Sequence, residues 1–566
     1  MKMNGARIML ECLKKEGVDT VFGYPGGTVI NIYDELFSFK EIRHILPRHE
    51  QAGTHAADGY ARATGKVGVA IATSGPGATN TVTAIATAYM DSIPMVIVTG
   101  QVPTALIGND AFQEVDIIGI TRPCTKHSFL IRDVKDIATI MKKAFYIART
   151  GRPGPVLVDF PKDIQVAMGE FSYPDSVEIR SYKPTVEGHP RQVEKACKMI
   201  LEARRPVLYV GGGVVLGDAS EQLTVLARKL GVPVTTTLMG LGSFPGDDPL
   251  SLGMLGMHGA YCANMAMTHS DLIIAVGSRF DDRVTGKLAT FAPHAKIIHV
   301  DVDPTSIKKN VRVDLPIVGD VKDVLAQMIK FTEKMMDKTA EFVAAMEPWH
   351  QEISAWKDKH PISYKSSTTT IKPQFVIQKL RELCDENAII STDVGQHQMW
   401  TAQFFKFNSP RTLLTSGGLG TMGYGLPAAM GAQAAFPGRQ VITICGDGGV
   451  QMNIQEMATL VQNRLPVKIV ILNNNFLGMV RQWQELFFDK RYSQTCMELP
   501  IDYIKLADAY GAKGFLATKP DEVEKVIKQG FAEKGPVIME FKIAREEKVL
   551  PMVPAGASLN EMVLNA

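Results

Sequence analysis

The sequence predicts an α/β protein of three doubly wound domains with mostly parallel sheets. A chain of 566 residues is too long for one hydrophobic core. Along three blocks of it, short apolar runs alternate with Gly-rich turns and helical patterns. The clearest unit, residues 441–475, reads strand, helix, strand. Such a crossover winds right-handed and lays its two strands parallel in one sheet.

The composition is that of an ordinary globular protein, with 45% hydrophobic and 21% charged residues and a net charge of +2. Lys and Arg are scattered, which gives no case for nucleic acid or an anionic membrane. No apolar stretch reaches the roughly 18 residues that span a bilayer. The N-terminus lacks signal-peptide features, and the seven cysteines form no CxxC motif. We therefore expect reduced thiols and a cytoplasmic protein.

The first block, residues 1–170, begins with a strand that ends in the Gly-rich turn Tyr24–Gly27. A second strand runs into Glu50, which opens an Ala/Gly-rich helix. A third ends in the SGPG turn at 74–77, again followed by a helix of small residues. Helices of this composition pack closely, either on their own sheet or on another subunit.

A polar, proline-bearing stretch at 172–192 is typical of a linker. The second block, residues 190–340, has strand-like runs in RPVLYVGGG, VPVTTTL, DLIIAVGS and AKIIHVDVD. Its GGG at 211–213 lacks the GxGxxG spacing and the acid about 20 residues on that a nicotinamide site needs, so a plain tight turn is the better interpretation. Residues 334–365 form a second connection, residues 370–548 the third block and residues 549–566 a tail.

In the third block, one strand ends in Gly446-Asp447-Gly448 and the next ends at Asn474. Since parallel strands end at one edge of the sheet, Asp447 and Asn474 should lie side by side where such sheets bind ligands. A carboxylate and an amide oxygen suit Mg²⁺, which completes its shell with phosphates. The glycines allow close approach of a diphosphate, and a helix start favours the anion. The alternative without a ligand site is a purely structural strand–helix–strand crossover in the core, whose strands end in polar residues.

Glu50 is the second candidate. It follows an apolar strand and opens a helix, so a buried carboxylate near a sheet end is plausible. Taken alone, it is better explained as an N-terminal helix acid favoured by the macrodipole.

The GDG motif followed by about 25 residues and NN resembles the thiamine-diphosphate signature. The resemblance implies that Asp447, Asn474 and the backbone carbonyl of Phe476 hold Mg²⁺. It also implies that Glu50 hydrogen-bonds the aminopyrimidine ring and exchanges a proton with it. In this family the cofactor bridges two subunits, the Glu coming from the first domain of one chain and the diphosphate site from the third domain of another. The resemblance thus implies at least a homodimer.

Further segments narrow the resemblance to the catalytic subunits of acetolactate synthases (acetohydroxyacid synthases), over essentially the whole chain. They occur in order: YPGG (24–27), FQE (112–114), RPGPVLVDFPKD (152–163), MLGMHG (254–259), RFDDR (279–283), DVGQHQMW (393–400), GGLGTMGYGLPAA (417–429) and LGMVRQWQ (477–484). This implies three six-stranded sheets and a branched-chain amino-acid biosynthetic enzyme. Such an enzyme decarboxylates pyruvate on thiamine diphosphate and condenses the hydroxyethyl unit with pyruvate or 2-oxobutyrate. A homodimer or homotetramer with a small regulatory subunit is implied as well.

The resemblance assigns roles residue by residue. Gly27 and Gln113 would line the pocket beside the reacting carbon, the alternatives being a turn glycine and a surface amide. Lys162 would attract the anionic substrate, or be a solvated strand-end charge. Met479, Val480 and Trp483 would form the wall for the second 2-oxo acid, although a Trp at this spacing is more often a core residue. Cofactor contacts would come from Val394, Gly395, Gln396, His397, Gly446, Gly448 and Gly449 at the diphosphate, and from Gly420 and Met422 at the aminopyrimidine.

FAD is the third implied cofactor, in a role that is not redox in the main reaction. The pieces that match the family's FAD contacts carry Arg152, His258, Arg279, Asp301 and Asp320. The RFDDR segment also argues against the FAD-free catabolic acetolactate synthases.

Two classes of rival remain. A pyruvate oxidase or 2-oxo-acid decarboxylase would share the fold, whereas glyoxylate carboligase is disfavoured because it lacks the acid that Glu50 supplies. A non-catalytic scaffold is disfavoured because Asp447, Asn474 and Glu50 are all present.

Overall fold

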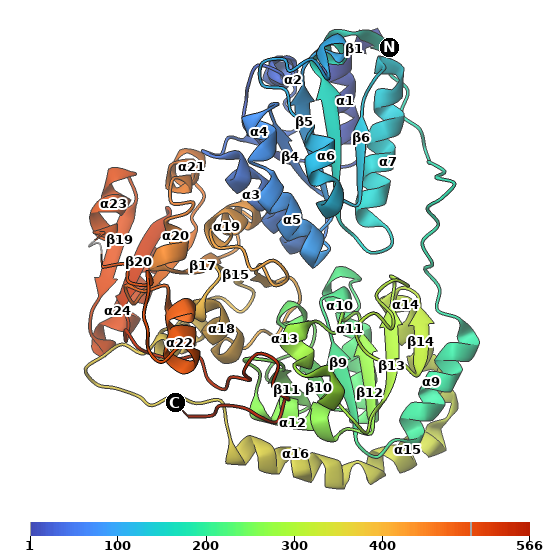
Figure 1. The fold of residues 1–566 in the computed structure, drawn as a ribbon, viewed down its shortest axis with the longest axis vertical. Helices are drawn as coiled ribbons and strands as arrows, with labels where there is room; N and C mark the ends of the chain where they lie inside the picture. The colour runs from blue at the N-terminus through green and yellow to red at the C-terminus, as the bar shows by residue number, and fades with distance from the viewer. Residues whose placement is uncertain (1, 499–500, 566) are drawn as a thin grey trace.

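The computed structural model describes residues 2–498 and 501–565 (Figure 1). Within these residues the chain forms three six-stranded sheets, in which every pairing is parallel. A small antiparallel pair joins β1 (Lys2–Asn4) to β8 (Met168–Glu170). The predicted fold class, α/β with three doubly wound domains, is confirmed. Each predicted range contains one of the large sheets, while the domain boundaries themselves stay a prediction.

The first sheet has the order β3-β2-β4-β5-β7-β6. Helices cover both faces, so the strands are buried on both sides and read as continuous apolar runs. The strands are β2 (Thr20–Gly23), β3 (Arg43–Ile45), β4 (Gly68–Ala72), β5 (Met95–Gln101), β6 (His127–Leu130) and β7 (Pro155–Pro161), and the main helices are α1 (Gly5–Lys15), α2 (Ile30–Ser38), α3 (Glu50–Thr64), α5 (Val82–Asp91), α7 (Ile137–Arg149) and α8 (Lys162–Val166).

The third sheet has the order β16-β15-β17-β18-β20-β19. Counted along the chain, this is the same order as in the first sheet. Its strands are β15 (Ile389–Thr392), β16 (Leu413–Leu414), β17 (Val441–Gly446), β18 (Lys468–Asn473), β19 (Lys513–Ala517) and β20 (Val537–Lys542), and its helices include α18 (Gln396–Phe404), α19 (Gly425–Ala435), α20 (Asp447–Val450), α21 (Glu456–Asn463), α22 (Gly478–Phe487), α23 (Tyr503–Ala509) and α24 (Val523–Ala532). The predicted crossover is therefore confirmed as β17-α20-α21-β18.

Helix α3 joins the first and third domains. It lies on its own sheet, as one alternative predicted, and it also packs against α19 of the same chain (Figure 1). The two backbones touch, because a Cβ added to Gly431 would lie 1.9 Å from the Ala56 carbonyl oxygen and one on Gly59 2.2 Å from that of Ala428. Small residues are thus needed on both helices.

The middle sheet has the order β11-β10-β9-β12-β13-β14, the arrangement of dinucleotide-binding folds. An extended linker, residues 171–189, leads into it along one side of the molecule (Figure 1). Its strands are β9 (Pro206–Val210), β10 (Val234–Thr236), β11 (Ser251–Met254), β12 (Leu272–Val276), β13 (Lys296–Asp301) and β14 (Leu315–Val318), and its helices include α9 (Pro190–Glu202), α11 (Ser220–Leu230), α12 (Tyr261–His269), α14 (Val321–Lys334), α15 (Met336–Ala345) and α16 (Glu347–Lys359).

The C-terminal tail crosses from the third domain to the middle one. The backbone amide of Val549 donates to the Gln482 side chain on α22, and that of Val553 donates to the Met257 carbonyl. Among the residues placed in the structure, no helix is both long and apolar enough to cross a membrane.

Candidate active site

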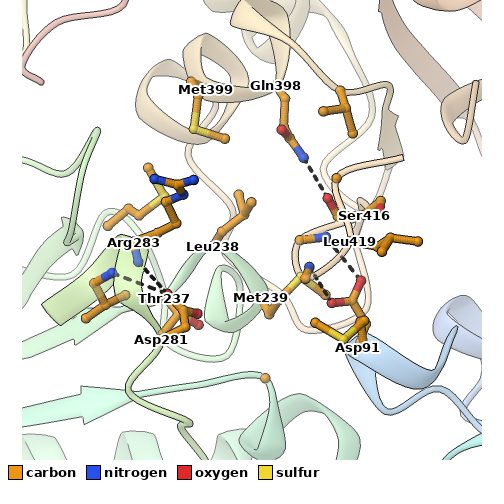
Figure 2. Close-up of a pocket in the computed structure, with 18 of the residues that line it drawn as sticks. Asp91, Thr237, Leu238, Met239, Asp281, Arg283, Gln398, Met399, Ser416 and Leu419 are labelled. Atoms are coloured by element: carbon orange, nitrogen blue, oxygen red, sulfur yellow. Dashed lines mark hydrogen bonds between the residues drawn. The ribbon is translucent and has the colours of Figure 1, made fainter. Parts of the chain in front are cut away.

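A cavity of about 1010 Å³ lies between the middle and third domains, with part of the first domain at its rim (Figure 2). Its walls are loops that follow the carboxyl ends of strands in two sheets. In the third sheet these are the loops after β15, β17 and β18, and in the middle sheet the loops after β9, β10 and β12. Open α/β sheets bind ligands at this edge.

Asp447 and Asn474 lie together in the wall of this cavity, as predicted. They follow the paired strands β17 and β18 and are 4% and 6% exposed. Burial raises the pKa of Asp447 to about 6, against the backbone amides of Asp447 itself and of Asn474, which favour the charged form. Phe476 lines the same cavity, and its amide donates to the Asn474 side-chain oxygen over 3.1 Å. Asp447 forms no ion pair with another described residue, and a buried carboxylate of this kind beside amide and carbonyl oxygens fits Mg²⁺.

The predicted diphosphate contacts surround this pair. Gln396 and His397 begin α18, Gly395 is its N-cap and Val394 precedes the cap. All four line the cavity with Gly446, Gly448 and Gly449. His397 is buried, and no described residue pairs with its Nε2. A side chain on Gly449 would lie 2.6 Å from the Asp393 carboxylate, so the backbone can follow this path beside Asp393 only because glycine stands there. An unpaired buried ring nitrogen beside bare backbone fits a diphosphate.

The side chain of Gln396 is already engaged in hydrogen bonds within the protein. Its side-chain amide donates to Gln482 and to the Glu547 carbonyl, each over 2.9 Å, and its oxygen faces the Asn474 amide at 3.4 Å. The side chain thus braces Asn474, which leaves the backbone of Gln396 for a ligand.

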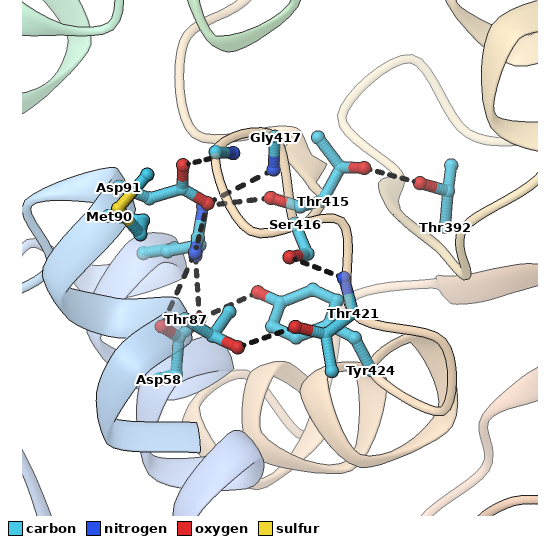
Figure 3. Close-up of polar contacts among 12 residues, drawn as sticks. Asp58, Thr87, Met90, Asp91, Thr392, Thr415, Ser416, Gly417, Thr421 and Tyr424 are labelled. Atoms are coloured by element: carbon cyan, nitrogen blue, oxygen red, sulfur yellow. Dashed lines mark hydrogen bonds and ion pairs between the residues drawn. The ribbon is translucent and has the colours of Figure 1, made fainter. Parts of the chain in front are cut away.

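The loop with Gly420 and Met422, which both line the cavity, is fastened by hydrogen bonds to a buried ion-pair network of the first domain (Figure 3). Arg62 pairs with Asp58 at 2.6 Å and with Asp91 at 2.9 Å. Asp91 accepts the backbone amides of Gly417 and Gly418 at the start of the loop. At its end, the Tyr424 hydroxyl donates to Asp58 over 2.6 Å.

Met479, Val480 and Trp483 project from α22 into the same cavity and into a neighbouring hollow of about 650 Å³. Val480 is 52% exposed, and Trp483 is half-buried with its ring edge-on to Phe487. The alternative that Trp483 is a core residue is wrong.

All five residues predicted to contact FAD line the far end of the cavity: Arg152, His258, Arg279, Asp301 and Asp320. Two of them also join this end to the first domain, because Arg279 donates to the Met90 carbonyl (2.6 Å) and Arg152 to the Ser92 hydroxyl (2.8 Å). Asp320 is instead occupied as the N-cap of α14.

The interpretation of the GGG at 211–213 as a plain turn was incomplete. These glycines line the cavity where the strand order reverses, between β9 and β12. They touch the turn after β12, since a Cβ on Gly277 would lie 2.7 Å from Gly213 Cα. A bare backbone cradle at the switch point of this topology fits a dinucleotide such as FAD.

The four predicted residues of the first domain lie elsewhere. Glu50, Gly27, Gln113 and Lys162 follow strands β3, β2, β5 and β7 at the edge of the first sheet, and none of them lines the cavity. Glu50 accepts a hydrogen bond from Asn80 at 2.9 Å. A Cβ on Gly75 would lie 3.0 Å from Gln113 Cα, and Gly27 has open space beside it. These four residues are thus separated from the cavity within one chain.

Several lining residues received no role in the sequence analysis, although some of them lie in the segments quoted there. Some of them follow strand ends and could be predicted from that position. The others come from loops that are distant in the sequence, and no residue spacing shows that these loops meet. They include Asp91, Thr237, Leu238, Met239, Asp281, Arg283, Gln398, Met399, Ser416 and Leu419 (Figure 2). In the described part of the chain, no three His, Cys, Asp or Glu side chains cluster as a metal site. A site with one carboxylate, one amide and one backbone carbonyl forms no such cluster.

Comparisons with known proteins agree with this geometry. Three family models match: thiamine pyrophosphate enzyme, N-terminal TPP binding domain, at residues 3–120; its central domain at 193–328; and its C-terminal TPP binding domain at 393–541. The acetolactate synthase large subunit of Haemophilus influenzae is 49% identical over 100% of this chain and 98% of its own length.

Two further relatives give the same result. The acetolactate synthase isozyme 3 large subunit of Escherichia coli is 47% identical over 100% of this chain and 99% of its own. The acetolactate synthase large subunit of Mycobacterium tuberculosis is 50% identical over 99% and 91%. With the paired strand ends, the dinucleotide-type middle sheet and these full-length matches, the chain belongs to the acetolactate synthase large-subunit family of thiamine pyrophosphate enzymes.

Proposed function

We propose that the chain catalyses the acetolactate synthase reaction: it decarboxylates pyruvate and joins the remaining two-carbon unit to a second 2-oxo acid. With pyruvate the product is 2-acetolactate, and with 2-oxobutyrate it is 2-aceto-2-hydroxybutyrate. The observation that supports this best is the single cavity that joins the Asp447–Asn474 edge, the α22 wall and the switch point of the middle sheet.

Each implied cofactor has residues to hold it. Asp447, Asn474 and the Phe476 carbonyl would hold Mg²⁺, and the backbone of Gly446–Gly449 with His397 would hold the diphosphate. The glycines after β9 and β12, with Arg152 and Arg279, would hold FAD. When bound, thiamine diphosphate supplies a carbon that adds to the pyruvate carbonyl and stabilises the negative charge left when CO₂ departs.

The protein residues orient the substrates and hold protons. Met479, Val480 and Trp483 would pack against the acceptor and keep water from it. Glu50 would hold a proton on the aminopyrimidine of the cofactor. Since Glu50 does not line the cavity of its own chain, we infer that a second copy brings its first-domain edge to that cavity. Lys162, Gly27 and Gln113 would arrive with it.

The relatives are named large subunits, and a partner small subunit is implied by that name. We propose that it has a regulatory role here. A homodimer is the smallest assembly that completes the site, and a cytoplasmic location stays a prediction.

The test is the product formed from pyruvate by the purified chain with Mg²⁺, thiamine diphosphate and FAD. Acetolactate and CO₂, with flavin absorbance unchanged during turnover, is the expected result. Acetate with peroxide would instead establish an oxidase, and acetaldehyde alone a decarboxylase. No product under any of these conditions would favour a binding scaffold.

A further inference from the structure

We propose that Glu456 is a positioning residue that holds Glu50 in place through the backbone before α3. Glu456 lies on α21, the helix that connects the two strands carrying Asp447 and Asn474. The third domain would thereby set the position of an acid that serves the cavity of a second copy. This inference rests on the role proposed above for Glu50.

The contact is made by the carboxylate of Glu456 and the chain just before α3. The backbone amide of Arg48 donates to both carboxylate oxygens, at 2.9 and 3.2 Å. Thr459, one turn along the helix, donates its hydroxyl to the same carboxylate at 2.7 Å. Gln462, a further turn on, accepts from the Arg48 guanidinium. One face of α21 therefore holds the segment around Arg48 of the first domain by hydrogen bonds.

Glu456 is completely buried, which is costly for an acid. Burial raises its pKa to about 7, against the amides of Arg48 and His49 and the Thr459 hydroxyl, which favour the charged form. The acid lies between two domains and is satisfied mainly by backbone rather than by an ion pair. Its removal would leave the Arg48 amide without its acceptor.

The chain between this contact and Glu50 is short and held in place on both sides. His49 is the N-cap of α3, with its ring accepting from the Gln51 amide at 3.1 Å, and Glu50 is the first helical residue. Pro47 is wedged against α3, since a Cβ on Gly53 would lie 2.7 Å from its ring. The Arg48 amide is thus a fixed point two residues before the acid, and a shift there changes where the Glu50 carboxylate points.

The test uses the full-length holoenzyme with Glu456→Ala and the conservative Glu456→Gln. The Ala variant loses the acceptor, and we expect kcat to fall about tenfold or more, because catalysis is sensitive to misplacement of about 1 Å. The KM for pyruvate and the affinity for thiamine diphosphate should stay within about twofold, since neither is bound by Glu456. Glu456→Gln keeps an oxygen acceptor and should recover kcat to within about threefold of the parent.

A double-mutant cycle with Glu50→Gln separates positioning from general damage. If Glu456 acts through Glu50, the Ala substitution should lower kcat little further in a Glu50→Gln background. An equal loss in both backgrounds would overturn the inference. Glu522→Ala is a matched control, because Glu522 also accepts backbone amides, those of Thr518 and Lys519, in the same domain. It should leave kcat unchanged.

The outcomes also separate this inference from the proposed function. Near-normal kcat for Glu50→Gln alone would overturn the role of Glu50 and, with it, the positioning role. A slow Glu50→Gln beside a fully active Glu456→Ala would overturn only the positioning role. If Glu456→Ala does not fold, Glu456→Asp, which withdraws the carboxylate by one methylene, should give an intermediate loss of kcat, and parental kcat for that variant would contradict the proposal.

Discussion

The first and third sheets share one strand order but differ in what surrounds their ligand-binding edges. The edge of the third sheet, at the ends of β15, β17 and β18, is enclosed in the large cavity. The corresponding edge of the first sheet, after β2, β4 and β5, does not line that cavity, and Phe112, in the segment after β5, is 88% exposed. Topology therefore fixes where each edge lies, while the residues on it decide the chemistry. One edge carries the oxygens that we propose for a metal, and Glu50, near the other edge, does not line the large cavity.

The largest effect expected is loss of the metal at the enclosed edge. Asp447→Ala removes the one carboxylate there, and we expect cofactor affinity to fall by at least about a hundredfold and activity to disappear with it. Titration of thiamine diphosphate in the presence of Mg²⁺, followed by calorimetry, measures this. Asp508→Ala, an exposed acid of the same domain, is the control. Unchanged affinity in Asp447→Ala would remove the distinction between the two edges.

Near the edge of the first sheet, Glu50→Gln should leave folding and cofactor affinity intact and lower kcat by about 10²–10⁴-fold, the usual range for a lost proton-transfer group. Steady-state kinetics with parallel cofactor titration separates the two quantities. Exposed Glu41 in the same domain offers the control Glu41→Gln.

Combining the two inactive variants tests whether the edges meet across a dimer. A mixed dimer of Asp447→Ala and Glu50→Gln chains has one complete site, so random mixing should restore about a quarter of the parental activity. Failure to recover any activity in demonstrably mixed dimers would mean that both edges must come from one chain.

The enclosed edge was predictable from sequence, because consecutive parallel strands must end side by side and Asp447 and Asn474 each follow such a strand. The separation of Glu50 from that edge was not, since strand spacing within one domain does not say which domain, or which copy, faces it. The place of the GGG turn in the cavity wall was missed for a similar reason. Its partner is the turn at Gly277, and only the three-dimensional order of the strands brings the two together. The Arg48–Glu456 contact spans 408 residues of sequence and leaves no local pattern.

A smaller effect is expected at Trp483, which lines the cavity from α22 beside the enclosed edge. Trp483→Leu enlarges the space against which the acceptor would pack, and the preference for 2-oxobutyrate over pyruvate should fall several-fold, as is usual when a pocket must sense one methylene. Competition between the two acids, with both products quantified, gives the ratio directly. Phe487→Leu changes the neighbouring ring on the same helix without touching the cavity. An unchanged ratio in Trp483→Leu would remove this residue from the acceptor site.

The last effect is on stability rather than activity, and it concerns α3, the helix that begins at Glu50 and packs against α19. His55 is buried on α3 against Tyr424, and no described residue pairs with either ring nitrogen. Burial, helped by the nearby Arg62 charge, lowers its pKa to about 3. As the pH falls below about 6.5, His55 takes up a proton in the unfolded chain but not in the native protein. The contribution of neutral His55 to the unfolding free energy is therefore fully present above about pH 6.5 and is lost as the pH falls toward about 3. Relative to His55→Phe, the parent should lose up to about 1.4 kcal/mol of unfolding free energy per pH unit in that window.

The midpoint of the first urea transition, followed for both proteins between pH 7 and pH 4, measures this difference. His294→Phe, at an exposed histidine, should run parallel to the parent throughout. If the gap between the parent and His55→Phe stays constant with pH, the proton is not excluded by the fold. His55 would then take up its proton in the native protein as readily as in the unfolded chain.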